Sequence, residues 1–298
     1  MLDLNRVFKH DRLMRSLTGM NLAAFDQLLP SFNAAYQAGH PLSPKRQRAP
    51  GAGRKANLQQ MEEKLFFVLF YFKCYPTFDL AGILFDFDRA QAHRWLHRLQ
   101  PILEAALDRE LMLPKRQLHS VAEFISSFPE VERVIVDGVE RPIQRPQDKA
   151  RQQRTYTGKK KRNTRKHLGL SDQDKRILLL SEAKDGSFHD KTMLDNSVIA
   201  EHIPIDVPIQ VDLGFKGFEN EYENIELPHK KPRGGQLTEN QRQENRLFSA
   251  ERVVVEHAFG GMKRYKAAAD VYRNRKENFD DHLMVTTAGL WNFYLAAA

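Results

Sequence analysis

Three acidic residues, far apart along the chain, occupy positions that suit the binding of divalent metal ions. Asp137 follows the apolar run 134–136 and Asp212 follows the run 209–211, so each is expected at the end of a β-strand. Glu256 lies in a stretch whose apolar residues repeat with a helical period. Carboxylate oxygens are hard ligands that suit Mg²⁺, and two such ions about 4 Å apart can activate one oxygen and stabilise another in phosphodiester chemistry. The three residues therefore predict a catalytic site that binds two Mg²⁺ ions, with Mn²⁺ as a substitute.

Each aspartate also has a simpler explanation. An aspartate at a strand end often caps a turn, and glycines lie close to both Asp137 and Asp212. Taken singly, capping is the better explanation of either residue; taken together with Glu256, a shared site is. The 75 residues between the aspartates leave room for a hairpin and a helix, and the 44 residues from Asp212 to Glu256 leave room for a strand and half a helix.

Glu251 is the rival for the third acidic position. Its helical angle directs it toward the apolar face of the predicted helix, so Glu256 is preferred. Arg252 and Lys263 fall on the same stripe as Glu256 and are expected to pair with the metal-bound carboxylate or with a DNA phosphate. His189 and His257 are interpreted as neutral surface residues rather than ligands.

A strongly basic segment separates the first two predicted strands. Residues 145–166 contain ten Lys and Arg residues and one acidic residue, Asp148. A solvated loop does not need so unequal a ratio, and a basic loop beside a metal site would bind phosphates on both sides of the cut. The phosphate-binding residues predicted from this segment are Lys159, Lys160, Lys161, Arg162, Arg165 and Lys166.

The first part of the chain reads as helical. Residues 1–38 form an amphipathic segment with a break at Thr18-Gly19, and residues 39–57 form a basic Pro/Gly linker that cannot pack alone. Residues 58–128 read as a further set of helices, in which a short helix, a tight turn and a third helix resemble a helix-turn-helix. A three-helix bundle without DNA contacts would show the same pattern. The candidate DNA contacts are Arg54, Lys55, Arg89, Gln91, Arg94 and Arg98.

From residue 129 to residue 298 the pattern changes to α/β. Strands are expected at 133–139, 166–170, 176–182 and 208–212, with a possible fifth at 225–227. Helices are expected at 190–202, from 238 toward 266, and at 280–295. Three strands, a helix, a strand and a late helix, with acids on the first and fourth strands, indicate an RNase H-like mixed-sheet domain preceded by the all-helical region.

Composition narrows the class of protein further. The chain has 298 residues and a net charge of +8, with a pI near 9.5, which suits a polyanionic partner such as double-stranded DNA. A single cysteine excludes an internal disulfide and a cysteine-based metal cluster. The N-terminus has no signal-peptide pattern, and the longest apolar run, 65–72, is far too short for a membrane span. A cytoplasmic, nucleoid-associated protein with no membrane partner is expected.

On these motifs the chain resembles the DDE transposases of bacterial insertion sequences, in the branch related to the Harbinger group. The matching segments are 136–146, 156–161, 186–190, 211–217 and 252–263, with 53–55 and 75–98 similar to the helix-turn-helix module of that family. Two positions depart from the usual pattern. Asn163 stands where many relatives carry His, and Asp86 stands in a turn usually held by Gly.

The resemblance implies a transposase with Asp137, Asp212 and Glu256 as its metal-binding triad. It implies binding to the terminal inverted repeats, cleavage and strand transfer to target DNA, and at least a homodimer when two ends are paired. One alternative is a catalytically inactive, element-derived DNA-binding regulator, although all three acids are present. A second is a stand-alone RNase H-like nuclease acting on hybrids or junctions, which has less need of a sequence-reading helix-turn-helix.

Overall fold

The structure is a computed structural model that describes residues 2–39 and 56–297. The chain forms two compact units: Met1–Leu113 with Lys263–Asp270 and Gly289–Ala298, and Pro114–Met262 with Val271–Ala288. The predicted boundary at residues 128 and 129 therefore falls inside the second unit, and two C-terminal segments join the first. Most of the predicted linker, including Arg54 and Lys55, lies outside the described residues. No helix in the described ranges has the length and apolar character of a membrane span.

The first unit is helical. Its elements are α1 (Leu4–Val7), α2 (Asp11–Thr18), α3 (Leu22–Gly39), α4 (Met61–Cys74), α5 (Phe78–Phe85), α6 (Arg89–Arg109) and α11 (Lys266–Ala269). The predicted break follows α2, where Gly19 adopts a left-handed φ of 84°. Pro101 was expected to end or kink the third predicted helix, but α6 continues to Arg109. The residues around Pro101, including Leu99 and Leu103, are fully buried, and this packing offsets the hydrogen bond that proline removes.

The turn between α5 and α6 has the geometry of a tight helix-turn-helix. Asp86 ends α5 with a left-handed φ of 57°, a conformation that glycine adopts without strain, which explains why Gly is usual there. Asp88 caps α6 as predicted, because its side chain accepts a hydrogen bond from the Gln91 backbone N–H at 2.7 Å. The two helices are thereby fixed with the start of α6 at the surface.

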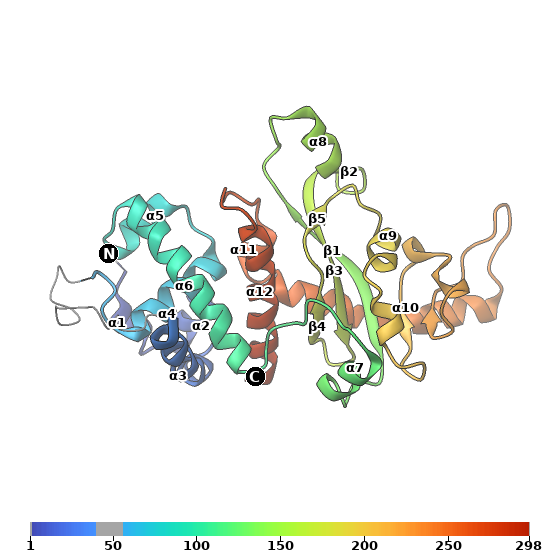
Figure 1. Ribbon diagram of the computed structural model, residues 1–298, viewed down its shortest axis with the longest axis horizontal. Coiled ribbons are helices and arrows are strands. Elements are labelled where there is room, and N and C mark those ends of the chain that lie inside the picture. Colours follow the sequence, from blue (N-terminus) through green and yellow to red (C-terminus); the bar gives the residue numbers. More distant parts are fainter. Residues whose placement is uncertain (1, 40–55, 298) are drawn as a thin grey trace. The chain divides into compact units, whose positions relative to one another are not determined.

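The second unit is built on a mixed sheet. Its strands are β1 (Val134–Pro142), β2 (Tyr156–Thr157), β3 (Arg162–Asp172), β4 (Ile177–Leu180), β5 (Lys184–Asp185), β6 (Ile209–Gln210) and β7 (Ile225–Glu226). The order is β2-β3-β1-β6-β7, and β4 and β5 also pair with β3 (Figure 1). β1 is antiparallel to β3 and parallel to β6, which is parallel to β7. The predicted fold class, an RNase H-like mixed sheet preceded by helices, is confirmed.

Helices surround this sheet and differ in detail from the predicted ones. They are α7 (Val121–Ser127), α8 (Lys149–Thr155), α9 (Asp190–Asp195), α10 (Glu239–Met262) and α12 (Phe279–Ala296), with short 3₁₀ turns η1 (Ile199–His202), η2 (Leu213–Phe215) and η3 (Phe218–Asn220). The helix expected at 190–202 is split into α9 and η1 by Val198, which has a positive φ of 51°. The basic segment expected as a loop contains α8, and β3 begins four residues earlier than predicted.

The two faces of β1 have different neighbours. Val134 and Val136 face a core with Leu168, Leu170 and the α9 residue Leu194. Because side chains alternate along a strand, Asp137 faces the opposite side. That side carries α10, which contacts both β1 and β3.

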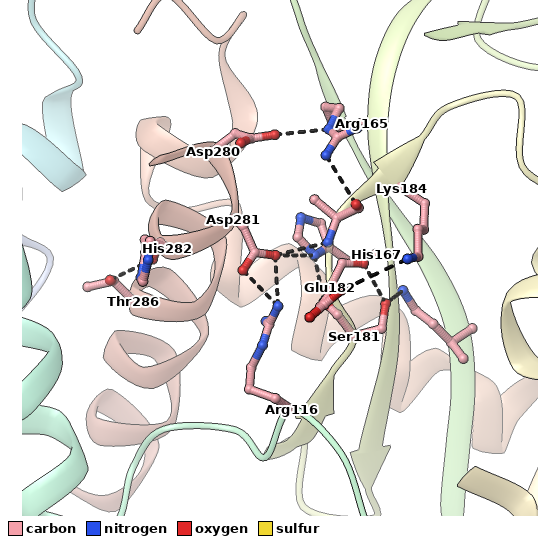
Figure 2. Close-up of polar contacts among 12 residues, drawn as sticks. Arg116, Arg165, His167, Ser181, Glu182, Lys184, Asp280, Asp281, His282 and Thr286 are labelled. Carbon is pink, nitrogen blue, oxygen red and sulfur yellow. Dashed lines mark hydrogen bonds and ion pairs between the residues drawn. The ribbon is translucent and has the colours of Figure 1, made fainter. Parts of the chain in front are cut away.

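A buried polar cluster joins β3 to the first turns of α12 (Figure 2). The Asp281 carboxylate accepts two hydrogen bonds from Arg116, at 2.8 and 2.7 Å, and one from the Ala183 backbone N–H at 2.9 Å. The His167 ring lies 3.6 Å from the same carboxylate, and its Nδ1 contacts the Ser181 carbonyl at 2.9 Å. His167 is 1% exposed, and burial lowers its pKa to about 4.

This histidine is expected to make stability depend on pH. The unfolded chain binds a proton at His167 near pH 6.5, whereas the native state does so only near pH 4, so the free energy of unfolding falls as pH decreases between these values. The expected contribution is about 3 kcal/mol. Urea titrations from pH 7 to pH 4 would measure it. His167→Gln should flatten this part of the profile, and the exposed control His119→Gln should not; parallel profiles for all three proteins would contradict the assignment.

Candidate functional site

Asp137 and Asp212 lie at matching positions on adjacent parallel strands. β1 and β6 pair Val134 with Ile209 and Ile135 with Gln210, an offset of 75 residues. The same offset pairs Asp137 with Asp212, just beyond the end of β6. Neighbouring strands are about 4.8 Å apart, and residues side by side in parallel strands point to the same face. The structure therefore brings the two aspartates together on the side of the sheet that faces α10.

The electrostatics of Asp137 agree with this placement. Burial raises the pKa of its carboxyl, and the charges of Asp212 and Asp190 raise it further. The Arg252 guanidinium, with Nη2 3.8 Å from Asp137 Oδ2, and the Gly138 N–H, 2.7 Å from Oδ1, act in the opposite direction. A carboxylate in such surroundings is stabilised by a nearby cation, and α10 supplies one through Arg252.

Glu256 lies on the side of α10 that faces this part of the sheet. Arg252, one turn earlier, contacts Asp137. Phe259, almost one turn later, packs against Gly169, where an added Cβ would lie 2.4 Å from the ring; Gly169 is the β3 partner of Asp137. Residues four apart on a helix lie on one face, so Glu256 is positioned between two contacts to the strands.

The Glu256 carboxylate itself is not brought into contact with the aspartates. Glu256 is exposed, and among the residues that the structure describes no three His, Cys, Asp or Glu side chains come close enough to hold one metal ion. The convergence of Asp137, Asp212 and Glu256 thus stays a prediction, with the first two adjacent and the third on the helix above them.

Glu251 has a different environment from the one expected. Its side chain is 43% exposed and does not lie on the apolar face of α10. It accepts a hydrogen bond from Gln210 at 2.5 Å and pairs with Arg133 at 2.8 Å. Arg133 precedes β1, four residues before Asp137, so Glu251 is held at the other end of this strand segment.

Two of the predicted phosphate-binding cations are used inside the protein. Arg165 pairs with Asp185 at 2.6 Å and with Asp280 at 3.0 Å, and Lys166 is 6% exposed and paired with acidic residues. The prediction was wrong for both because β3 begins earlier than expected, which places them within the sheet. Asn163 is also buried; its side-chain amide donates to α8 at the Gln152 carbonyl and to the Thr155 hydroxyl, which makes its role structural.

The remaining basic residues are distributed over both units. Those exposed in the turn between β2 and β3 are Lys159, Lys160, Lys161 and Arg162. Those exposed on α6 are Arg89, Arg94 and Arg98, of which Arg98 lies over the Trp95 ring at 5.3 Å. Gln91 is half-buried and its side chain completes the cap of α6, accepting from the Asp88 N–H at 3.4 Å, which leaves it less suited to a base contact than predicted. Lys263 is exposed and belongs to the helical unit.

Comparison with known proteins places the chain in a family. Residues 136–292 match the model of the DDE superfamily endonucleases, and residues 56–109 match the helix-turn-helix of DDE superfamily endonucleases. The chain belongs to this family of DNA endonucleases. It is 27% identical over 253 residues to the "Probable transposase for insertion sequence element IS702" of Microchaete diplosiphon, which covers 85% of this chain and 86% of the relative. No solved structure matches the chain significantly.

The donor set at the site fits a divalent metal ion. Endonucleases of the DDE superfamily depend on metal ions, and the two adjacent aspartates offer the hard oxygen ligands that Mg²⁺ and Mn²⁺ accept. The raised pKa of Asp137, against which the Arg252 cation acts, is the observation that supports the fit.

Proposed function

We propose that the protein is the transposase of a bacterial insertion sequence. It binds the terminal inverted repeats of its element, cuts the phosphodiester bond at the element end and joins the freed 3′-hydroxyl to target DNA. The observation that carries the proposal is the pairing of Asp137 with Asp212 on adjacent parallel strands beneath the helix that carries Glu256. The family of the chain and the name of its relative support it.

Each site residue has a role in this proposal. Asp137, Asp212 and Glu256 hold two Mg²⁺ ions, or Mn²⁺ in their place. When bound, such ions activate the attacking oxygen and stabilise the leaving oxygen. Arg252 lies beside Asp137 and offsets its charge, and its planar guanidinium is suited to a phosphate oxygen. The exchange of one phosphodiester bond for another requires no covalent bond to the protein.

DNA contacts come from both units. The exposed arginines of α6 read the terminal repeat, and the turn at 159–162 neutralises phosphates near the cut. Paired element ends require at least two copies of the chain in the working complex. The protein acts in the bacterial cytoplasm at the nucleoid.

Removal of two α6 arginines is expected to weaken sequence-specific binding. For Arg94→Ala/Arg98→Ala we expect affinity for an element-end duplex to fall about 10- to 100-fold, because each base contact contributes about 1–3 kcal/mol. If both residues contact phosphates instead, the slope of log affinity against log salt should fall by about 2. Filter binding across a salt series would measure both, with the exposed α2 residue Arg12 replaced by Ala as the control.

The same experiment separates the proposal from its alternatives. Equal affinity of the wild-type protein for end and scrambled duplexes would indicate a structure-selective nuclease and contradict the proposal. Specific binding without any cleavage in Mg²⁺ or Mn²⁺ would indicate a DNA-binding regulator.

A further inference from the structure

A buried cluster of charged residues lies next to Asp137 but outside the predicted triad. The Lys166 ammonium on β3 lies 3.0 Å from Asp190 Oδ1 and 3.5 Å from Glu140 Oε1, and it donates to the Phe188 carbonyl at 2.9 Å. The side chains of Lys166 and Glu140 are only 8% and 11% exposed. Two carboxylates share one ammonium, so the cluster keeps one negative charge.

Gly138 allows this cluster to approach the site. A Cβ at Gly138 would lie 2.8 Å from Asp190 Oδ1, so the Asp190 carboxylate rests against the strand backbone at the residue that follows Asp137. Any side chain at this position would displace it. Asp190 is the first residue of α9, and the Lys166 ion pair holds it in this place.

The cluster acts on Asp137 through its charge. Asp190 is among the groups that raise the pKa of Asp137, which shows that their carboxylates interact electrostatically. Extra negative charge behind a pair of carboxylates disfavours their charged forms without a metal and favours a divalent cation when one is present.

We propose, on the basis of the proposed function, that Asp190 is a positioning residue for the metal site, held against Gly138 by Lys166. It increases the affinity of Asp137 and Asp212 for a divalent cation and orients the cation's water ligands. Groups that support metal ligands in this way change metal affinity about 10- to 100-fold when removed. A purely structural cluster would change stability and leave metal affinity unaltered.

Metal binding to the full-length protein without DNA tests this role. We expect Asp190→Asn to weaken Mn²⁺ binding about tenfold, measured by calorimetry or by the electron paramagnetic resonance of free Mn²⁺. Gly138→Ala should weaken it in the same direction by displacing the carboxylate. Asp195→Asn is the matched control, because Asp195 ends the same helix and forms a half-exposed ion pair with Lys191 at 3.4 Å.

The outcomes separate the inference from the function on which it rests. Unchanged Mn²⁺ affinity in Asp190→Asn, together with lost binding in Asp137→Asn, would overturn the inference and leave the metal site intact. Unchanged affinity in Asp137→Asn would overturn the metal site as well. If Asp190→Asn does not fold, Glu140→Gln/Lys166→Met is compared with the triple variant that adds Asp190→Asn, and equal affinities of these two proteins would overturn the inference.

Discussion

Asp137→Asn is expected to reduce cleavage of element-end DNA by on the order of 10³-fold. A metal ion contributes several kcal/mol to stabilising the charge that develops at a phosphoryl group, and each 1.4 kcal/mol corresponds to a factor of ten in rate. Asparagine keeps the size of the side chain but removes the charge that attracts the ion. Single-turnover cleavage of a labelled end duplex in Mg²⁺ measures the loss, and Asp212→Asn should behave alike.

Two controls separate lost chemistry from lost structure. Burial raises the pKa of Asp137, so its charge opposes folding, and the asparagine variant should not unfold at a lower temperature than the wild type. Its affinity for end duplexes should also be unchanged, because α6 lies in the helical unit. Wild-type rates of Mg²⁺-dependent cutting by Asp137→Asn would remove this residue from the catalytic site.

Glu256→Gln and Glu251→Gln are expected to have very different effects. If Glu256 completes the metal site, its glutamine variant should lose cleavage on the order of 10³-fold, by the same reasoning as for Asp137. Glu251 pairs with Arg133 at a partly exposed position, where an ion pair contributes at most about 1 kcal/mol. Its glutamine variant should therefore cut DNA at nearly the wild-type rate and unfold at a slightly lower urea concentration.

The reverse result would reassign the third carboxylate. Abolished cutting in Glu251→Gln with retained cutting in Glu256→Gln would place the catalytic glutamate at the Gln210 end of the site. Loss of cutting in both variants, with binding of end DNA retained, would require rescue tests with aspartate at each position. Recovery in only one of these tests would identify the ligand.

The positions of the three acids along their elements could be predicted because the signals are local. A short run of β-branched residues ending in Asp, or apolar residues at helical spacing around Glu256, depends on neighbours within a few positions. The capping of α6 by Asp88 and the break at Gly19 are local in the same sense, and both were predicted from residue type. The strand order follows once an early hairpin and a later parallel strand are recognised.

The relations between distant segments needed the folded chain. The register that aligns Asp137 with Asp212 is set by hydrogen bonds between β1 and β6, and nothing near either residue specifies that offset. The fates of the basic residues differ for the same reason. Lys160 is exposed in a turn, whereas Lys166, six residues later, is enclosed by Asp190 and Glu140. Whether a charge faces water or a buried partner depends on which remote residues pack around it, and a count of charges along the chain does not contain that information.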